Sequence, residues 1–203
     1  MSGLRERKKQ QTRIDIVRSA EALFAERGLQ EPTMEEIAVA AEVAVATLYN
    51  YFGSKLAIQM AVFEAETAGI VAGGAAVVAD PGDDPEAAVE RLFDAYLDGF
   101  FAIDRSLLLD VFRAGFSSTE MLPGLVSLDL LLLEQLGEML GALAGRGLVA
   151  SEGIEDASLL LYSCLVTVLL SFLTVEAILP GDARDQVRRL VAAAFGGLRR
   201  AES

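Results

Sequence analysis

Apolar residues recur along almost the whole chain with the period of an α-helix, and the alternation typical of strands is scarce. The first such segment is followed by Gly28, a residue type that often stands just after a helix. The apolar face of that segment consists of Ile16, Val17, Ala20, Leu23 and Phe24. The pattern therefore predicts an all-α protein.

Two short helices are predicted directly after this segment. Thr33 and Glu36 fit a capping box at the start of the first, which covers 33–41. A break near Glu42 separates it from the second, which covers about 45–52. The residues expected to point inward are Ile37, Ala38, Ala41, Val43, Leu48 and Phe52. Two short helices joined by a tight turn have the spacing of a helix-turn-helix, although an ordinary helical hairpin gives the same pattern.

The rest of the chain is predicted to be helical as well, with one break. A helix from about Lys55 enters the alanine-rich stretch 67–79, but 73–84 contains glycine and proline and has the composition of a linker. The next helix starts at Asp84 and Pro85 and carries an apolar stripe as far as Phe100. The remaining helices are expected over 105–116, over 124–144, over 154–178, and from about 182 to beyond 198.

Charge divides the chain into two unlike parts. The net charge is −13, yet residues 1–55 hold eight basic and eight acidic residues, so the whole acidic excess lies in 56–203. Five of those basic residues stand among the first thirteen: Arg5, Arg7, Lys8, Lys9 and Arg13. A basic arm ahead of a neutral segment suits contact with phosphates, and a solvated charge run at a terminus is the alternative.

Residue types that are missing exclude several kinds of chemistry. The chain has no histidine, which removes histidine metal sites, Ser-His or Cys-His nucleophiles, and histidine acid–base catalysis. Its one cysteine, Cys164, allows no internal disulfide; it is expected to be a buried apolar residue, and a redox-sensor role is the alternative. No signal-peptide pattern stands at the start, so we expect a cytoplasmic protein. The residue types that are missing favour a protein that is not an enzyme, and we expect no metal and no cofactor.

The stretch Arg13–Ile58 resembles the DNA-binding region of the TetR family of transcriptional regulators. The resemblance rests on LFAERG at 23–28, TMEEIAVAA at 33–41 and TLYNYFGSK at 47–55. It implies a fold of nine to ten helices: a three-helix DNA-binding domain over 1–55, and a helical ligand-sensing and dimerisation domain over 56–203. It also implies a homodimer that represses transcription from a near-palindromic operator until an effector releases it.

The resemblance also assigns roles on the expected helix-turn-helix, position by position. Residues that correspond to phosphate-contacting positions are Thr33, Tyr49, Tyr51 and Lys55. Residues that correspond to positions facing base edges are Val45, Ala46, Thr47 and Asn50. Where Glu42 stands the family usually has glycine, and where Ala44 stands it often has a serine that caps the recognition helix. Each difference is expected to cost about 1 kcal/mol if Glu42 is left-handed and Ala44 is the N-cap.

The C-terminal part carries aromatic residues that either line a pocket or form ordinary core. The candidate ligand-binding residues are Tyr96, Phe100, Phe112, Phe116, Tyr162 and Phe172, with Phe101 nearby. Few charged residues accompany them, which favours a small hydrophobic or aromatic effector. Asp110 and Arg113 either orient a polar group of that effector or form a solvated face.

The last two helices carry the expected dimer contacts. The segment 157–175 has no formal charge, so it is either a membrane span or a helix buried on several sides. The resemblance implies the second, with residues of about 154–178 and 182–199 pairing with their dimer mates, and the periodic face of 187–198 fits that role. Rival interpretations remain: an all-helical protein or enzyme that binds hydrophobic ligands without specific DNA binding, a membrane-tethered DNA-binding protein, and a regulator that has lost ligand sensing.

Overall fold

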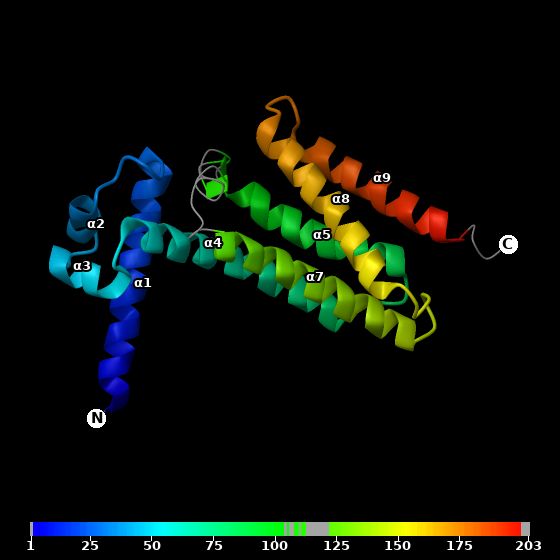
Figure 1. Ribbon diagram of the computed structural model, residues 1–203, viewed down its shortest axis with the longest axis horizontal. Coiled ribbons are helices and arrows are strands. Elements are labelled where there is room, and N and C mark those ends of the chain that lie inside the picture. The colour runs from blue at the N-terminus through cyan, green and yellow to red at the C-terminus, as the bar shows by residue number, and fades with distance from the viewer. Residues whose placement is uncertain (1, 104, 106–107, 110, 113–121, 200–203) are drawn as a thin grey trace. The chain divides into compact units, whose positions relative to one another are not determined.

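The computed structural model describes residues 2–103, 105, 108–109, 111–112 and 122–199, and within them it contains eight helices and no strand (Figure 1). The all-α class is confirmed, whereas the count of nine to ten helices is not reached. The helix expected over 105–116 lies largely outside the described residues, although its described members are helical. The helices are α1 (Ser2–Arg27), α2 (Met34–Ala40), α3 (Val45–Phe52), α4 (Lys55–Ala79), α5 (Pro85–Ala102), α7 (Leu122–Gly145), α8 (Ile154–Thr174) and α9 (Pro180–Arg199).

The chain forms two compact units. The first comprises residues 1–66 and 104–124, and the second comprises 67–103 and 125–203, so the division falls inside α4. In the first unit, α1 buries Ile16, Ala20 and Phe24, and α2 packs on α1 and on α3. These are the apolar positions that repeat with helical period in the sequence, and burial of each large apolar side chain stabilises the fold by about 1.5–3 kcal/mol.

The predicted linker over 73–84 is wrong for its first half, because α4 continues to Ala79. Gly74 is helical and lies where two buried side chains approach the α4 backbone: a Cβ there would stand 2.8 Å from Cε2 of Tyr96. Tyr96 donates a hydrogen bond to Oε1 of Gln135 (3.0 Å), and Nε2 of Gln135 donates to the carbonyl of Val71 (3.0 Å). Glycine in this stretch therefore allows close packing of helices, and the break between α4 and α5 is confined to 80–84.

The second unit is built around α5, α8 and α9. α9 packs against both α8 and α5. Arg184 on α9 binds Asp94 (3.0 Å) and Asp98 on α5, and Arg188 also reaches Asp94 (3.4 Å). Several apolar side chains of α5 are almost fully buried; they include Leu92, Phe93 and Leu97.

Three residues of the periodic face of α9 are buried within their own subunit, so they are not available for the dimer contact expected of this face. Val187, Val191 and Phe195 are each at most 8% exposed in the single chain. Leu190 and Ala194 of the same face are half-buried and remain accessible. α9 also begins earlier than expected, at Pro180, because proline suits the first helical position and the amide of Leu179 is capped by Asp182 (3.0 Å).

Two helices of the structure, α4 and α8, are long and apolar enough to cross a membrane by length and composition alone. Buried helices of soluble proteins pass the same test. In α8, the hydroxyl groups of Ser163, Ser171 and Thr174 each donate to the carbonyl four residues earlier, so these polar groups are satisfied within the helix.

Candidate nucleic-acid interface

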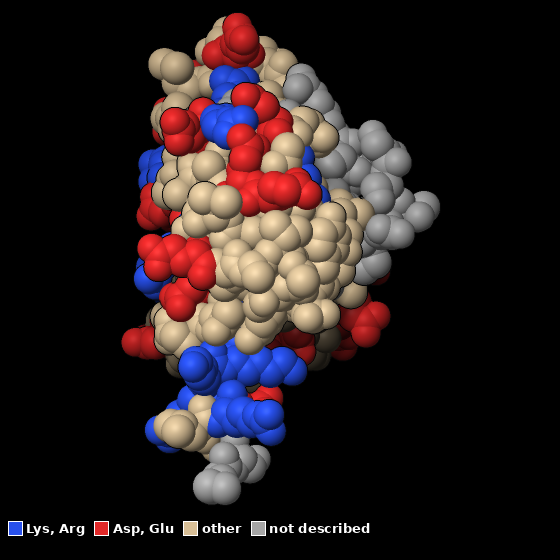
Figure 2. All heavy atoms as spheres, turned by 90° about the vertical axis from the view of Figure 1, so that its left-hand side faces the viewer, with Lys and Arg blue, Asp and Glu red and all other residues tan. Residues whose placement is uncertain are grey.

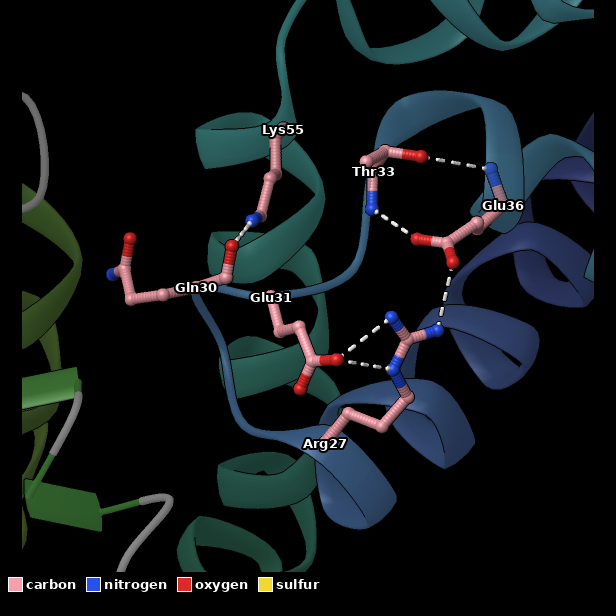
Figure 3. A network of polar contacts seen from close by, with 6 residues as sticks. All are labelled: Arg27, Gln30, Glu31, Thr33, Glu36 and Lys55. Carbon is pink, nitrogen blue, oxygen red and sulfur yellow. Dashed lines mark hydrogen bonds and ion pairs between the residues drawn. The ribbon is translucent and has the colours of Figure 1, made fainter.

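The first helix of the predicted pair, α2, begins with the capping box expected from the sequence (Figure 3). The amide of Glu36 donates to Oγ1 of Thr33 (3.2 Å), and the amide of Thr33 donates to the Glu36 carboxylate (2.8 Å). These bonds, together with Arg27, hold the pKa of Glu36 below its usual range. Thr33 is exposed and its hydroxyl proton is not used by the cap, so it can still donate to a phosphate.

Arg27 at the end of α1 fixes the turn that leads into α2. Its guanidinium binds Glu31 (3.0 Å) and Glu36 (2.8 Å), which come before and after the start of α2. Figure 3 shows the three side chains converging on this turn. Arg27 therefore helps to orient α2, because the carboxylates of Glu31 and Glu36 already accept hydrogen bonds from its guanidinium.

The first two turns of α4 are bound to the same turn by two side chains. Nζ of Lys55 donates to the carbonyl of Gln30, and Nε2 of Gln59 donates to the carbonyl of Leu29 (2.7 Å). Lys55 and Gln59 are four residues apart and therefore lie on one face of α4. We call these two contacts the α4 clamp. Lys55, expected to contact phosphate, is half-buried here, and this burial lowers its pKa.

The turn between α2 and α3 has both of the unfavourable features expected from the sequence. Glu42 has φ +54°, and within the described residues it is the one non-glycine residue with positive φ. Ala44 is the N-cap of α3 and, lacking a side-chain acceptor, leaves α3 without a side-chain cap. The backbone compensates in part, since the amide of Val43 donates to the carbonyl of Ala38 (2.9 Å).

Helix α3 is held from one side and open on the other. Leu48 and Phe52 are buried, as predicted, and fix its orientation. Val43, also expected to be inside, is only half-buried. The residues expected to face DNA are all accessible: Ala46, Tyr49 and Asn50 are exposed, and Val45, Thr47 and Tyr51 are half-buried. The open face of α3 thus carries two phenols, an amide, a hydroxyl and small apolar groups, which can contact phosphates and base edges.

The helix-turn-helix itself carries no positive charge. No Lys or Arg occurs between Arg27 and Lys55, whereas four glutamates do. Figure 2 views this side of the molecule and shows basic side chains gathered at the end where the chain begins, while acidic side chains with some basic ones among them cover much of the rest. Attraction to a phosphate backbone must therefore come from residues outside α2 and α3.

Two important residues of this region were not predicted from the sequence. Arg27 contacts Glu36, nine residues away, and Gln59 contacts Leu29, thirty residues away, so these contacts depend on the fold. The sequence gives a weak indication that Gln59 has a structural role, because it is a polar residue within an apolar stretch. In the structure its side chain is 6% exposed. A buried amide requires a partner, but the sequence does not say which one.

The candidate ligand-binding residues are only partly brought together. Tyr96 and Phe100 on α5 and Phe172 on α8 are buried, and Tyr162 on α8 is half-buried and bonded to Asp129 on α7, all in the second unit. Burial and the contact with Asp129 raise the pKa of Tyr162 to about 12. Phe112 belongs to the first unit, and Phe116, Asp110 and Arg113 lie outside the described residues.

Two further expectations concern reactive groups. Cys164 is half-buried, and burial raises the pKa of its thiol, which lowers the share of the reactive thiolate. Among the described residues, no group of three or more His, Cys, Asp or Glu side chains could hold a metal ion.

Comparison with known proteins agrees with this geometry. A family model described as bacterial regulatory proteins, tetR family, matches residues 16–62. The chain is 34% identical over 158 residues to the HTH-type transcriptional regulator TcmR of Streptomyces glaucescens. That match covers 75% of this chain and 66% of the relative, so the chain spans about two thirds of the relative's length.

Solved structures share the fold over nearly the whole chain. FadR of Thermus thermophilus, a TetR-family transcriptional repressor solved in complex with lauroyl-CoA, matches with a TM-score of 0.69 and 24% identity, covering 92% of this chain and 94% of that one. A TetR-family transcriptional regulator from Streptomyces coelicolor matches with a TM-score of 0.71 and 19% identity, covering 95% and 83%.

Proposed function

Because the chain belongs to the TetR family of bacterial regulatory proteins, we propose that it is a cytoplasmic, ligand-responsive transcriptional repressor rather than an enzyme. In this proposal a homodimer binds a near-palindromic operator, and a small hydrophobic or aromatic effector releases it. Thr33, Tyr49 and Tyr51 contact phosphates, while the exposed face of α3 reads base edges in the major groove.

One observation carries the DNA-binding part of the proposal: the open face of α3 is supported on its other side by buried Leu48 and Phe52. An exposed helix anchored in this way presents its side chains rigidly to a groove. Because Val45 and Ala46 are apolar, part of the base reading takes place through contact with thymine methyl groups.

The release step is proposed to pass through α4. This helix runs without interruption from Lys55 to Ala79, and the α4 clamp binds its first two turns to the turn that precedes α2. A displacement of α4 by an effector therefore carries α2 and α3 with it and alters the spacing of the two recognition helices of the dimer. The effector must favour the released state by a few kcal/mol, about 5.5 kcal/mol for a shift from 1:99 to 99:1.

The class of effector is proposed from the residues of the second unit. Tyr96, Phe100 and Phe172 are aromatic, and the same unit holds two hydrogen-bonded pairs, Tyr96–Gln135 and Tyr162–Asp129. Sites of this composition suit ligands that are mostly apolar and carry one or two polar groups.

The decisive test is selection of bound fragments from the source genome by the purified protein, followed by sequencing. We expect enrichment of one or a few near-palindromic sites with half-sites about 10 base pairs, or a multiple of that, apart. The Asn50→Ala variant should lose enrichment while keeping its helical content, since Asn50 is exposed.

No enrichment by a soluble, dimeric wild-type protein would overturn the regulator proposal in favour of a helical ligand-binding protein. Equal affinity of an effector for the free and the operator-bound protein would overturn the release mechanism alone, because a ligand that binds both states equally shifts neither.

A further inference from the structure

The beginning of the chain forms a helix that extends beyond the core of its unit. α1 starts at Ser2, but its first fully buried residue is Ile16. Residues 3–11 are all exposed, and they include four of the basic residues of the chain: Arg5, Arg7, Lys8 and Lys9. At 1.5 Å per residue, Arg5 stands about 12 Å along the helix from Arg13. We call residues 3–12 the basic extension.

Three of the four basic side chains lie on the helical face that α1 buries further along. Arg5, Lys9, Thr12 and Ile16 follow one another at intervals of four, three and four residues, and Lys8 precedes Thr12 by four. Ile16 is fully buried, Thr12 is half-buried, and the residues before them are exposed. The basic face thus continues the core-facing side of α1 past the end of the core.

A contact at the base of the extension places this face beside the recognition helix. The guanidinium of Arg13 stacks over the ring of Phe52, the last residue of α3, at 4.9 Å from the ring centroid. Hydrogen bonds from Thr12 to the carbonyl of Lys8 (3.0 Å) and from Gln11 to Asp15 (2.9 Å) run along the helix through this point. The extension is therefore continuous with the part of α1 that supports α2 and α3.

The extension also holds the positive charge that the helix-turn-helix lacks. Of the eight basic residues in 1–66, Arg27 is paired with two glutamates and Lys55 belongs to the α4 clamp. Within the described part of the chain, no ion pair is formed by Arg5, Lys8 or Lys9. Figure 2 shows basic side chains gathered at the end of the molecule where α1 begins.

We propose that the basic extension is a second DNA-contacting element, in which Arg5, Lys8 and Lys9 bind backbone phosphates beside the major groove that α3 enters. This proposal rests on the proposed function and adds to it the source of its electrostatic attraction. The contacts carry no sequence information, so they strengthen operator and non-operator binding alike.

The test compares two variants that lose the same charge from opposite faces of α1. Lys8→Gln/Lys9→Gln removes two charges from the basic face. Arg7→Gln/Arg18→Gln removes two from the other side, because Arg7 is about 200° from Arg5 around the helix and Arg18 shares the phase of Arg7. All four positions are exposed and glutamine is a good helix former, so both variants keep the fold, which circular dichroism checks.

The readout is the dependence of affinity on salt, measured on a duplex carrying the selected site and on a scrambled duplex. The slope of log K against log salt should fall by about 1.8 in Lys8→Gln/Lys9→Gln, about 0.9 for each lost phosphate contact, on both duplexes. It should stay at the wild-type value in Arg7→Gln/Arg18→Gln. Hydroxyl-radical protection outside the stretch covered by α3 should vanish in the first variant alone.

An equal fall of the salt slope in the two variants would overturn the proposal, because the positive charge would then act without regard to its position on α1. An unchanged slope in both variants would overturn it as well. Binding of the wild type to phosphatidylserine vesicles, abolished by Lys8→Gln/Lys9→Gln while DNA binding is unchanged, would overturn it in favour of a membrane surface. If the wild type prefers no site but the face-specific slope change persists on the scrambled duplex, the extension is supported and the operator-specific function fails.

Discussion

At the scale of single residues, the turn between α2 and α3 departs from what its backbone prefers. Glu42 occupies a left-handed conformation and Ala44 an N-cap without a side-chain acceptor. Both features could be anticipated, since the position of a turn and of a cap depends on neighbours only a few residues away.

Replacement of these residues should stabilise the protein. Glu42→Gly removes the left-handed strain and should raise the free energy of unfolding by up to about 1 kcal/mol. Ala44→Ser adds a cap to α3 and should add about 1 kcal/mol. Urea denaturation measures both effects. Ala41→Gly is the control, because Ala41 has φ −85° and no strain to relieve; a gain in this control equal to that of Glu42→Gly would contradict the explanation.

Contacts between residues that are far apart in the sequence could not be predicted from local patterns. Thr33 and Glu36 were predicted as a pair because three residues separate them, and a helix start brings such residues together. Lys55 and Gln59 find their carbonyl partners 25 and 30 residues away. Their contacts depend on how α4 packs against the turn that follows α1, which no local sequence pattern encodes.

At the scale of helices, glycine was the residue most easily misjudged. Gly73 and Gly74 have the composition of a linker, yet both lie inside α4. A glycine signals either a turn or a close approach of two helices, and only the packed structure separates these. Apolar periodicity, by contrast, located the helices well, because each helix of the unit must bury one face.

Gly99 on α5 shows such a close approach and should not tolerate a methyl group. A Cβ at this position would stand 2.9 Å from Cδ1 of Ile70 on α4. Gly99→Ala should therefore lower the free energy of unfolding by about 1–3 kcal/mol, through forced repacking. Gly73→Ala is the matched control, since its Cβ would meet Ala95 at 3.7 Å, an ordinary contact.

Thermal or urea unfolding of the two variants distinguishes the cause. Alanine is favoured over glycine inside a helix by up to about 1 kcal/mol, so Gly73→Ala should be neutral or stabilising. If Gly99→Ala is as stable as Gly73→Ala, the contact with Ile70 does not limit the distance between α4 and α5.

At the scale of the whole molecule, we expect the proposed homodimer to form through the exposed side of α8. One stripe of α8 repeats at intervals of three and four residues and is exposed throughout; it comprises Leu160, Ser163, Thr167, Leu170 and Thr174. A stripe of two leucines and three small hydroxyl residues at this spacing suits close packing of two helices. The sequence located this helix, but it did not show that Val187, Val191 and Phe195 on α9 pack within their own subunit. A periodic apolar face looks the same whether it packs within a subunit or between two.

Charge placed on this stripe should separate the dimer. Leu160→Glu buries a carboxylate in the proposed interface, so the protein should become monomeric and lose operator binding, which needs two recognition helices. Sedimentation equilibrium measures the first effect and gel shift the second. Leu130→Glu on α7 is the control, since Leu130 is 59% exposed and lies outside the proposed interface. A dimeric Leu160→Glu protein would place the interface elsewhere.

The α4 clamp limits where the DNA-binding segment of such a regulator can be joined to a different sensor domain. A hybrid joined at residue 55 would give the grafted sensor its own residue at position 59 and leave the carbonyl of Leu29 without the amide of Gln59. A transplanted DNA-binding segment must therefore include α4 at least as far as Gln59. Lineages that exchange sensors by recombination would be expected to cross over inside this helix, not at its beginning.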